Sequence, residues 1–105
     1  MGKFTNKWVV VTGASSGIGA GFAREVAKLG GHLILVARRT NRLESLQKEL
    51  QENYSSEVIS IFADLSTIEG ARNTHKTIAK LGKDISFLIN NAAAGLHGKF
   101  GDLSY

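Results

Sequence analysis

The sequence predicts an α/β fold in which helices cover both faces of one parallel β-sheet. Two observations support this prediction. Four short runs of apolar, largely β-branched residues recur along the chain, and three stretches with apolar residues at helical spacing separate them. The 105 residues are 43% hydrophobic and 21% charged, close to the roughly 45–50% and 25% of ordinary globular proteins. We therefore expect one packed domain over residues 1–105.

The first two predicted elements are a buried strand and an amphipathic helix. Lys7–Val11 is a short apolar run suited to a strand that is buried on both faces. The following helix is expected over Gly17–Leu29, because two glycines follow it and stop it. The buried stripe of this helix is predicted to consist of Ile18, Phe22, Val26 and Leu29.

The second strand and helix repeat this pattern. Leu33–Ala37 is again a run of apolar residues, and the next helix is expected over Thr40–Asn53. Asn41 and Glu44 can form a capping box at its start. The helix would bury a stripe made of Leu43, Leu46 and Leu50.

A third strand, a third helix and a last strand complete the series. The strands are predicted at Glu57–Phe62 and Ile85–Ile89. Between them, Ser66 and Glu69 form a second capping box, which would open the third helix. The apolar residues of this helix are Ile68, Ala71, Ile78 and Leu81.

Strands that alternate with helices in this way form right-handed parallel βαβ units. The predicted strand order is 3-2-1-4, a Rossmann-type, three-layer, doubly wound sheet that is truncated after the fourth strand. Two helices would cover one face and the third would cover part of the other, leaving Ile85–Ile89 as an apolar, unpaired edge. An open edge invites pairing, so a homo-oligomer through this edge is one expectation.

A glycine-rich segment between the first strand and the first helix is the strongest chemical signal. Its three glycines would provide a tight turn, a close backbone approach and close helix packing. Backbone N–H groups at a helix start bind phosphate, so this segment predicts a diphosphate site rather than a turn that only connects two elements. The candidate residues are Gly13, Ser15, Ser16, Gly17, Ile18 and Gly19.

Two arginines, Arg38 and Arg39, follow the second predicted strand. In a dinucleotide-binding sheet the adenosine ribose lies near this position, where an acidic residue would bind both ribose hydroxyls. Guanidinium groups bind phosphate as paired donors, so the arginines favour the 2′-phosphate of NADP over the plain ribose of NAD. The alternative is that both arginines are solvated at the start of the second helix.

Three motifs in order resemble those of the short-chain dehydrogenase/reductase family. Thr12–Gly19 matches its glycine motif, Ala63-Asp64-Leu65 is similar to its adenine-contacting segment, and Asn90-Asn91-Ala92 matches the start of its Asn-Asn-Ala-Gly motif. The resemblance implies an NADP-dependent oxidoreductase that transfers hydride between the nicotinamide cofactor and a carbonyl or secondary alcohol. It implies that Asp64 hydrogen-bonds the adenine amino group. The further cofactor-binding residues that it implies are Leu65, Asn91 and Ala92.

The chain departs from the family pattern in two places. Ala93 stands where the family usually has glycine, so its methyl group would either crowd the cofactor or have no effect. The family also moves a proton with a Tyr-x-x-x-Lys pair, whereas Tyr54 is followed four residues later by Val58, and Tyr105 is the last residue. We therefore expect no catalytic residue here and no turnover by this chain alone, which would carry the cofactor-binding half of such an enzyme. The alternative is a non-catalytic nucleotide-binding or interaction module that uses the exposed sheet edge.

Composition argues against several other functions. The chain has no cysteine, and His32, His75 and His97 show no metal-ligand spacing, so no metal is expected. The net charge of +4 is spread without a dense basic patch, so nucleic acid is not an expected partner. No apolar run approaches the roughly 20 residues of a membrane span. We expect a cytoplasmic protein that binds a dinucleotide.

Overall fold

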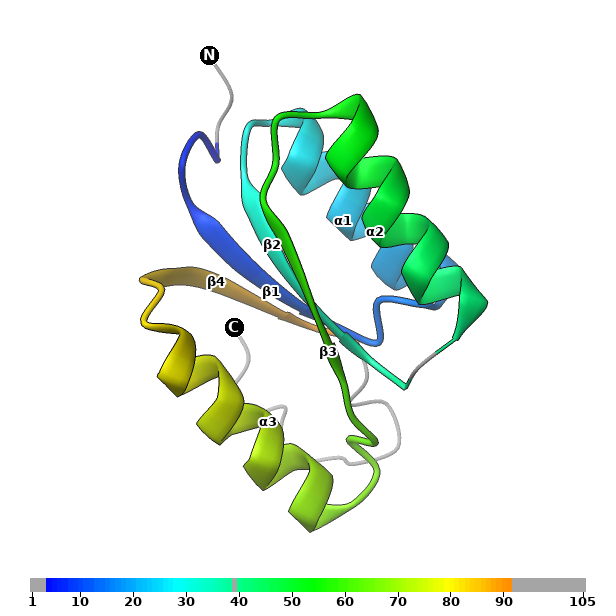
Figure 1. Cartoon of the computed structure of the whole chain (residues 1–105), viewed down its shortest axis with the longest axis vertical. Helices are drawn as coiled ribbons and strands as arrows, with labels where there is room; N and C mark the ends of the chain where they lie inside the picture. Colours follow the sequence, from blue (N-terminus) through cyan, green and yellow to red (C-terminus); the bar gives the residue numbers. More distant parts are fainter. Residues whose placement is uncertain (1–3, 39, 92–105) are drawn as a thin grey trace.

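A computed structural model of the chain describes residues 4–38 and 40–91. Within these residues, four strands alternate with three helices, and the strands form one parallel sheet in the order β3-β2-β1-β4 (Figure 1). The predicted topology is confirmed. The elements are β1 (Trp8–Thr12), α1 (Gly17–Lys28), β2 (His32–Ala37), α2 (Asn41–Asn53), β3 (Val58–Phe62), α3 (Ile68–Leu81) and β4 (Ile85–Asn90).

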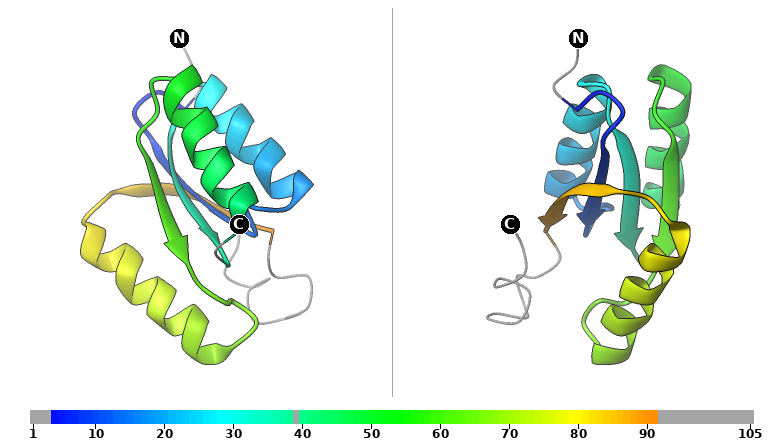
Figure 2. Two further views of the ribbon diagram at one scale, coloured as in Figure 1. Left: turned by 45° about the vertical axis from the view of Figure 1, so that its right-hand side comes forward. Right: turned by 90° about the vertical axis from the view of Figure 1, so that its left-hand side faces the viewer.

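The helices form two layers around the sheet. The helices α1 and α2 lie side by side on one face, and α3 lies on the other (Figure 1; Figure 2). All five residues of β1 are buried, as are five of the six residues of β2, which explains why both central strands consist of apolar residues without alternation. The side chains on the α1 and α2 side include Val9, Val11, Leu33 and Leu35, and those on the α3 side include Val10, Ile34 and Val36.

The predicted buried stripe of α1 is wrong at two positions. Ile18 is 68% exposed and Phe22 is 44% exposed. The helix instead turns a row of mostly small residues to the sheet, because it packs too closely on the strands to admit larger side chains. The buried residues of α1 are Gly19, Ala23, Val26 and Ala27.

Both predicted capping boxes are displaced by one residue. The N-cap of α2 is Thr40, whose hydroxyl accepts a hydrogen bond from the Leu43 amide at 3.0 Å, and Asn41 is already helical. The N-cap of α3 is Thr67 rather than Ser66. In both cases the residue just before the first helical one has the extended backbone that a cap needs. Ile68, one of the apolar residues expected in this helix, is its first residue and is 79% exposed.

The two outer strands of the sheet differ in how their edges are covered. On β3, the side-chain amides of Gln47 and Gln51 donate hydrogen bonds to the Val58 carbonyl, at 3.1 and 3.4 Å. On β4, Phe87 is 49% exposed, and in the described part of the chain this strand pairs with β1 alone. The expectation of an apolar, incompletely covered strand at this edge is therefore confirmed. No helix within the described residues is long and apolar enough to cross a lipid bilayer.

Candidate functional site

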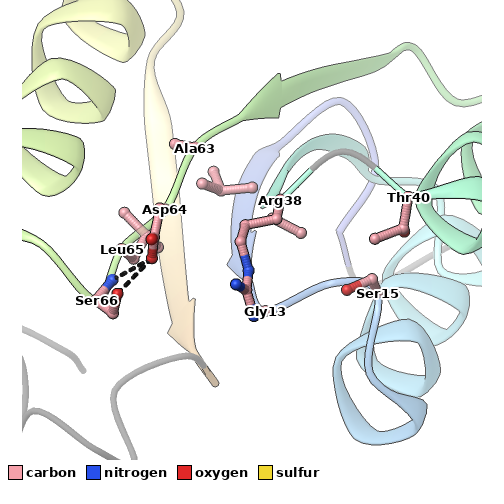
Figure 3. Close-up of a pocket in the computed structure, with 10 residues that line it drawn as sticks. Gly13, Ser15, Arg38, Thr40, Ala63, Asp64, Leu65 and Ser66 are labelled. Carbon is pink, nitrogen blue, oxygen red and sulfur yellow. Dashed lines mark hydrogen bonds between the residues drawn. The ribbon is translucent and has the colours of Figure 1, made fainter.

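The carboxyl ends of β1, β2 and β3 surround a cavity of about 280 Å³ (Figure 3). Ligands of open parallel sheets bind at this end, where the chain turns from each strand into the next helix. The sequence predicts site residues in the turn after β1, at Arg38 after β2 and at Asp64 after β3, and all three places line this one cavity. The lining residues are Gly13, Ser15, Val36, Ala37, Arg38, Thr40, Ala63, Asp64, Leu65 and Ser66.

The turn after β1 is built around Gly13. Its φ of 63° lies in the left-handed region, which glycine adopts without strain. The Gly13 carbonyl accepts hydrogen bonds from the Ser16 amide at 3.1 Å and from the Ser16 hydroxyl at 2.9 Å. Ser16 is the N-cap of α1, so these two bonds fix the turn against the first turn of the helix.

Glycine is required at Gly19 by close packing. A Cβ at this position would lie 2.9 Å from the carbonyl carbon of Gly13 and closer still to the carbonyl oxygen. A Cβ at Gly17, in contrast, would meet no atom within 4 Å. The backbone of Gly17 is therefore open to an incoming group, and among the described residues its N–H and that of Ile18 have no hydrogen-bond partner. Unpartnered amides at the positive end of a helix are donors of the kind that bind phosphate groups.

The adjacent residues Ser15 and Ser16 have different environments. The Ser16 hydroxyl accepts hydrogen bonds from the Gly19 amide at 3.0 Å and from the Asn91 side-chain amide at 2.7 Å. Its own hydrogen is donated to Gly13, so all of its hydrogen-bonding capacity is used within the protein. The Ser15 hydroxyl lines the cavity and has no partner among the described residues. Ser15 is therefore the serine that is available to a ligand.

Two asparagines join the end of β4 to this turn. The side-chain amide of Asn91 donates to the Gly13 carbonyl at 3.3 Å as well as to Ser16. One residue earlier, Asn90 accepts a hydrogen bond from the buried Thr12 hydroxyl at 2.9 Å. The Nδ2 atom of Asn90 is buried without a partner in the described part of the chain, beside a small cavity of about 80 Å³ against α3. Both asparagines thus brace the sheet edge next to the turn.

Opposite charges face each other across the cavity. The guanidinium of Arg38 extends toward the Gly13 turn, and Asp64 lies at the end of the cavity formed by the β3 to α3 connection (Figure 3). Hydrogen bonds from the hydroxyl and amide of Ser66, together with the charge of Arg38, hold the pKa of Asp64 below its ordinary value of 3.8. Asp64 is therefore an ionised hydrogen-bond acceptor at neutral pH, and Arg38 is an exposed cation.

The structure brings together the predicted residues at the ends of β1, β2 and β3, but two predicted residues cannot be placed. Arg39 and Ala92 lie outside the described residues, as does Ala93. Thr40 and Ser66 also line the cavity but are not among the predicted site residues. The signal that could have found them is position, because Thr40 directly follows Arg39 and Ser66 directly follows Leu65. Within residues 4–38 and 40–91, no three His, Cys, Asp or Glu residues are grouped so as to hold a metal ion.

Comparisons with known proteins agree with this geometry. The family model described as short chain dehydrogenase matches residues 7–105. The chain is 38% identical over 97 residues to an NADP-dependent 3-hydroxy acid dehydrogenase of Schizosaccharomyces pombe, covering 91% of this chain and 38% of that protein. It is 46% identical over 89 residues to 11-beta-hydroxysteroid dehydrogenase-like 2 of Arabidopsis thaliana, covering 84% of this chain and 29% of that protein.

A solved reductase structure shares the fold of this chain. The L-sorbose reductase of Gluconobacter frateurii, crystallised with NADPH and L-sorbose, superposes with a TM-score of 0.77 at 35% identity, covering 87% of this chain and 34% of the reductase. The chain thus spans about a third of the length of these relatives.

Proposed function

This chain belongs to the short-chain dehydrogenase family, and from that premise we propose that it is the cofactor-binding part of an NADP-dependent oxidoreductase. The reaction of the whole enzyme would transfer a hydride between the cofactor and a carbonyl or secondary alcohol. The residues of this chain would bind and orient the adenosine and diphosphate part of the cofactor.

The observation that carries this proposal is the glycine turn at the start of α1. Gly19 has no room for a side chain, Gly17 has an open backbone, and the first amides of the helix are without partners in the described residues. A turn with a purely structural role would not require an open backbone at Gly17 or amides without partners at the start of α1. The turn also opens into the cavity of about 280 Å³, so a diphosphate bound there would continue into a space suited to adenosine.

Adenosine recognition would use the other two sides of the cavity. The ionised carboxylate of Asp64 can accept a hydrogen bond from the adenine amino group. Arg38 and Ser15 would face the ribose, and a guanidinium with a hydroxyl favours a phosphate on that ribose. Two of the relatives support the choice of NADP, because one is named as NADP-dependent and another was crystallised with NADPH.

Calorimetric titration of the chain with ADP-ribose and with 2′-phospho-ADP-ribose tests this proposal. Both ligands lack nicotinamide, so binding reports on the described cavity. Arg38→Ala should weaken 2′-phospho-ADP-ribose by about tenfold and ADP-ribose much less, since it removes a charged hydrogen bond to the phosphate. Arg72→Ala, which removes an exposed arginine from α3, is the matched control and should change neither affinity. Failure of the folded chain to bind either ligand would contradict the proposal.

A second candidate function is self-association through β4. It is favoured by Phe87, which is 49% exposed, and by the contrast with β3, whose edge receives the glutamine side chains of α2. A two-fold axis beside β4 would pair the same edge of two copies of this chain and bring two Phe87 rings together. Phe87→Glu should then shift the sedimentation coefficient from dimer to monomer, and Phe62→Glu on β3 should not. A chain that is monomeric at every concentration would exclude this function.

A further inference from the structure

A second cavity, of about 530 Å³, lies in the groove between α1 and α2. Because both helices follow parallel strands, their N-termini lie at the same end of the sheet, next to the cofactor cavity. Ser15 lines both cavities, so it lies between the groove and the cofactor cavity. The groove is lined from the α1 side by Ala14, Ser15, Ser16, Gly17, Ala20 and Arg24, and from the α2 side by Asn41, Arg42, Ser45, Leu46 and Glu49.

The two arginines of this groove differ in their partners. Arg24 forms a two-pronged ion pair with Glu49, with distances of 2.8 Å from Nε to Oε2 and 3.1 Å from Nη2 to Oε1. This pair occupies both oxygens of Glu49, the acidic residue that lines the groove. Arg42 has neither an ion pair nor a hydrogen bond among the described residues. The groove therefore contains a guanidinium whose charge the described protein does not neutralise.

The position of Arg42 on its helix is electrostatically unfavourable. It is the second residue of α2, where the positive end of the helix dipole repels a cation. A residue that served only to stabilise this helix would be neutral or acidic at that point. An anion bound next to Ser15 would reverse this balance, because Arg42, the helix end and Arg38 would all attract it.

We propose that Arg42 is a further specificity residue for the 2′-phosphate of NADP, in addition to the predicted Arg38 and Arg39, and that it binds the phosphate from the groove side of Ser15 while Arg38 binds it from the cofactor cavity. This inference rests on the proposed function. A ribose 2′-phosphate carries close to two negative charges at neutral pH, so two guanidinium groups on opposite sides match its charge better than one. The free hydroxyl of Ser15 lies between the two cavities and would donate to the same phosphate.

Titration of the unchanged chain, Arg42→Ala and Lys48→Ala with 2′-phospho-ADP-ribose and ADP-ribose tests the role of Arg42. Lys48 is an exposed cation of the same helix that does not line the groove, so it controls for the loss of one positive charge. Arg42→Ala should weaken 2′-phospho-ADP-ribose by about tenfold and leave ADP-ribose within about twofold. Lys48→Ala should change both by less than about twofold, because an exposed charge at that distance is screened by salt. Arg42→Lys should recover part of the loss, since lysine restores the charge without the paired donors.

Three outcomes distinguish this inference from its alternatives. If Arg42→Ala changes neither affinity, the role of Arg42 is overturned and the proposed function stays intact. Equal weakening of both ligands, accompanied by a lower thermal midpoint, overturns it by showing that Arg42 only supports the helix. Failure of the unchanged chain to bind either ligand overturns the proposed function, and this inference with it.

Discussion

Replacing Gly19 with alanine separates the packing role of the glycine turn from helix propensity. In an open helix interior, alanine is favoured over glycine by about 0.5–1 kcal/mol. At Gly19 the added Cβ would lie 2.9 Å from the Gly13 carbonyl carbon and 3.0 Å from the Cα of Ala14, whereas ordinary contacts begin at 3.4 Å. These are backbone atoms that no side-chain rotation can move. The start of α1 would have to withdraw by about 0.5 Å or more, and overpacking of this kind costs about 1–3 kcal/mol.

Gly21→Ala provides the matched control two residues further along α1, because a Cβ there would meet no atom within 4 Å. Urea unfolding monitored by circular dichroism should show Gly19→Ala destabilised by about 1–3 kcal/mol and Gly21→Ala stabilised by about 0.5–1 kcal/mol. Gly19→Ala should also lose ADP-ribose affinity, because the displaced turn carries the proposed diphosphate site. If both variants gained stability equally, the close approach of α1 to the Gly13 turn would not be a real constraint.

Four further substitutions test the candidate site and the cap of α3. The hydrogen bonds from Ser66 lower the pKa of Asp64, so its carboxylate stabilises the folded chain above about pH 4 and loses this effect as the pH falls through the lowered pKa. Asp64→Asn should therefore flatten the acid side of a plot of thermal midpoint against pH, and an unaltered acid side would contradict the assignment. Thr67→Ala should lower the free energy of unfolding by about 1 kcal/mol, because it removes the cap on the Gly70 amide. Ser66→Ala, a change at the residue first predicted as the cap, should cost less in the same urea titration. Asn91→Ala should weaken ADP-ribose by about threefold to tenfold in calorimetry, since the turn loses the amide that holds Gly13 and Ser16. An affinity equal to that of the unchanged chain would show that the turn holds its shape without Asn91.

The order and type of the elements could be predicted because the burial of each strand determines which residue types occupy its own positions. A central parallel strand is covered on both faces, so it needs an unbroken apolar run, and Val9–Val11 and Leu33–Val36 show such runs. Which face of a helix is buried could not be predicted in the same way. Ile18 and Phe22 lie at ideal helical spacing, but the face that α1 turns inward depends on how closely it approaches the sheet. That distance is set by Gly19 against Gly13, a contact that hydrophobic spacing does not reveal.

In the candidate site, too, the nearby sequence predicts some features, whereas contacts between residues far apart in the chain decide others. The positions of the turn, of Arg38 and of Asp64 follow from one rule, namely that ligands bind at the carboxyl ends of parallel strands. The roles of Ser15 and Ser16 could not be separated in this way, because the two residues are chemically identical neighbours in one motif. Ser16 is occupied by the amide of Asn91, which lies 75 residues further along the chain. Only the pairing of β4 with β1 brings this amide to the turn. The choice of which hydroxyl remains for a ligand is therefore a property of the sheet topology, and Ser15→Ala should reduce phosphate affinity by removing a free donor, whereas Ser16→Ala should act first on the stability of the turn.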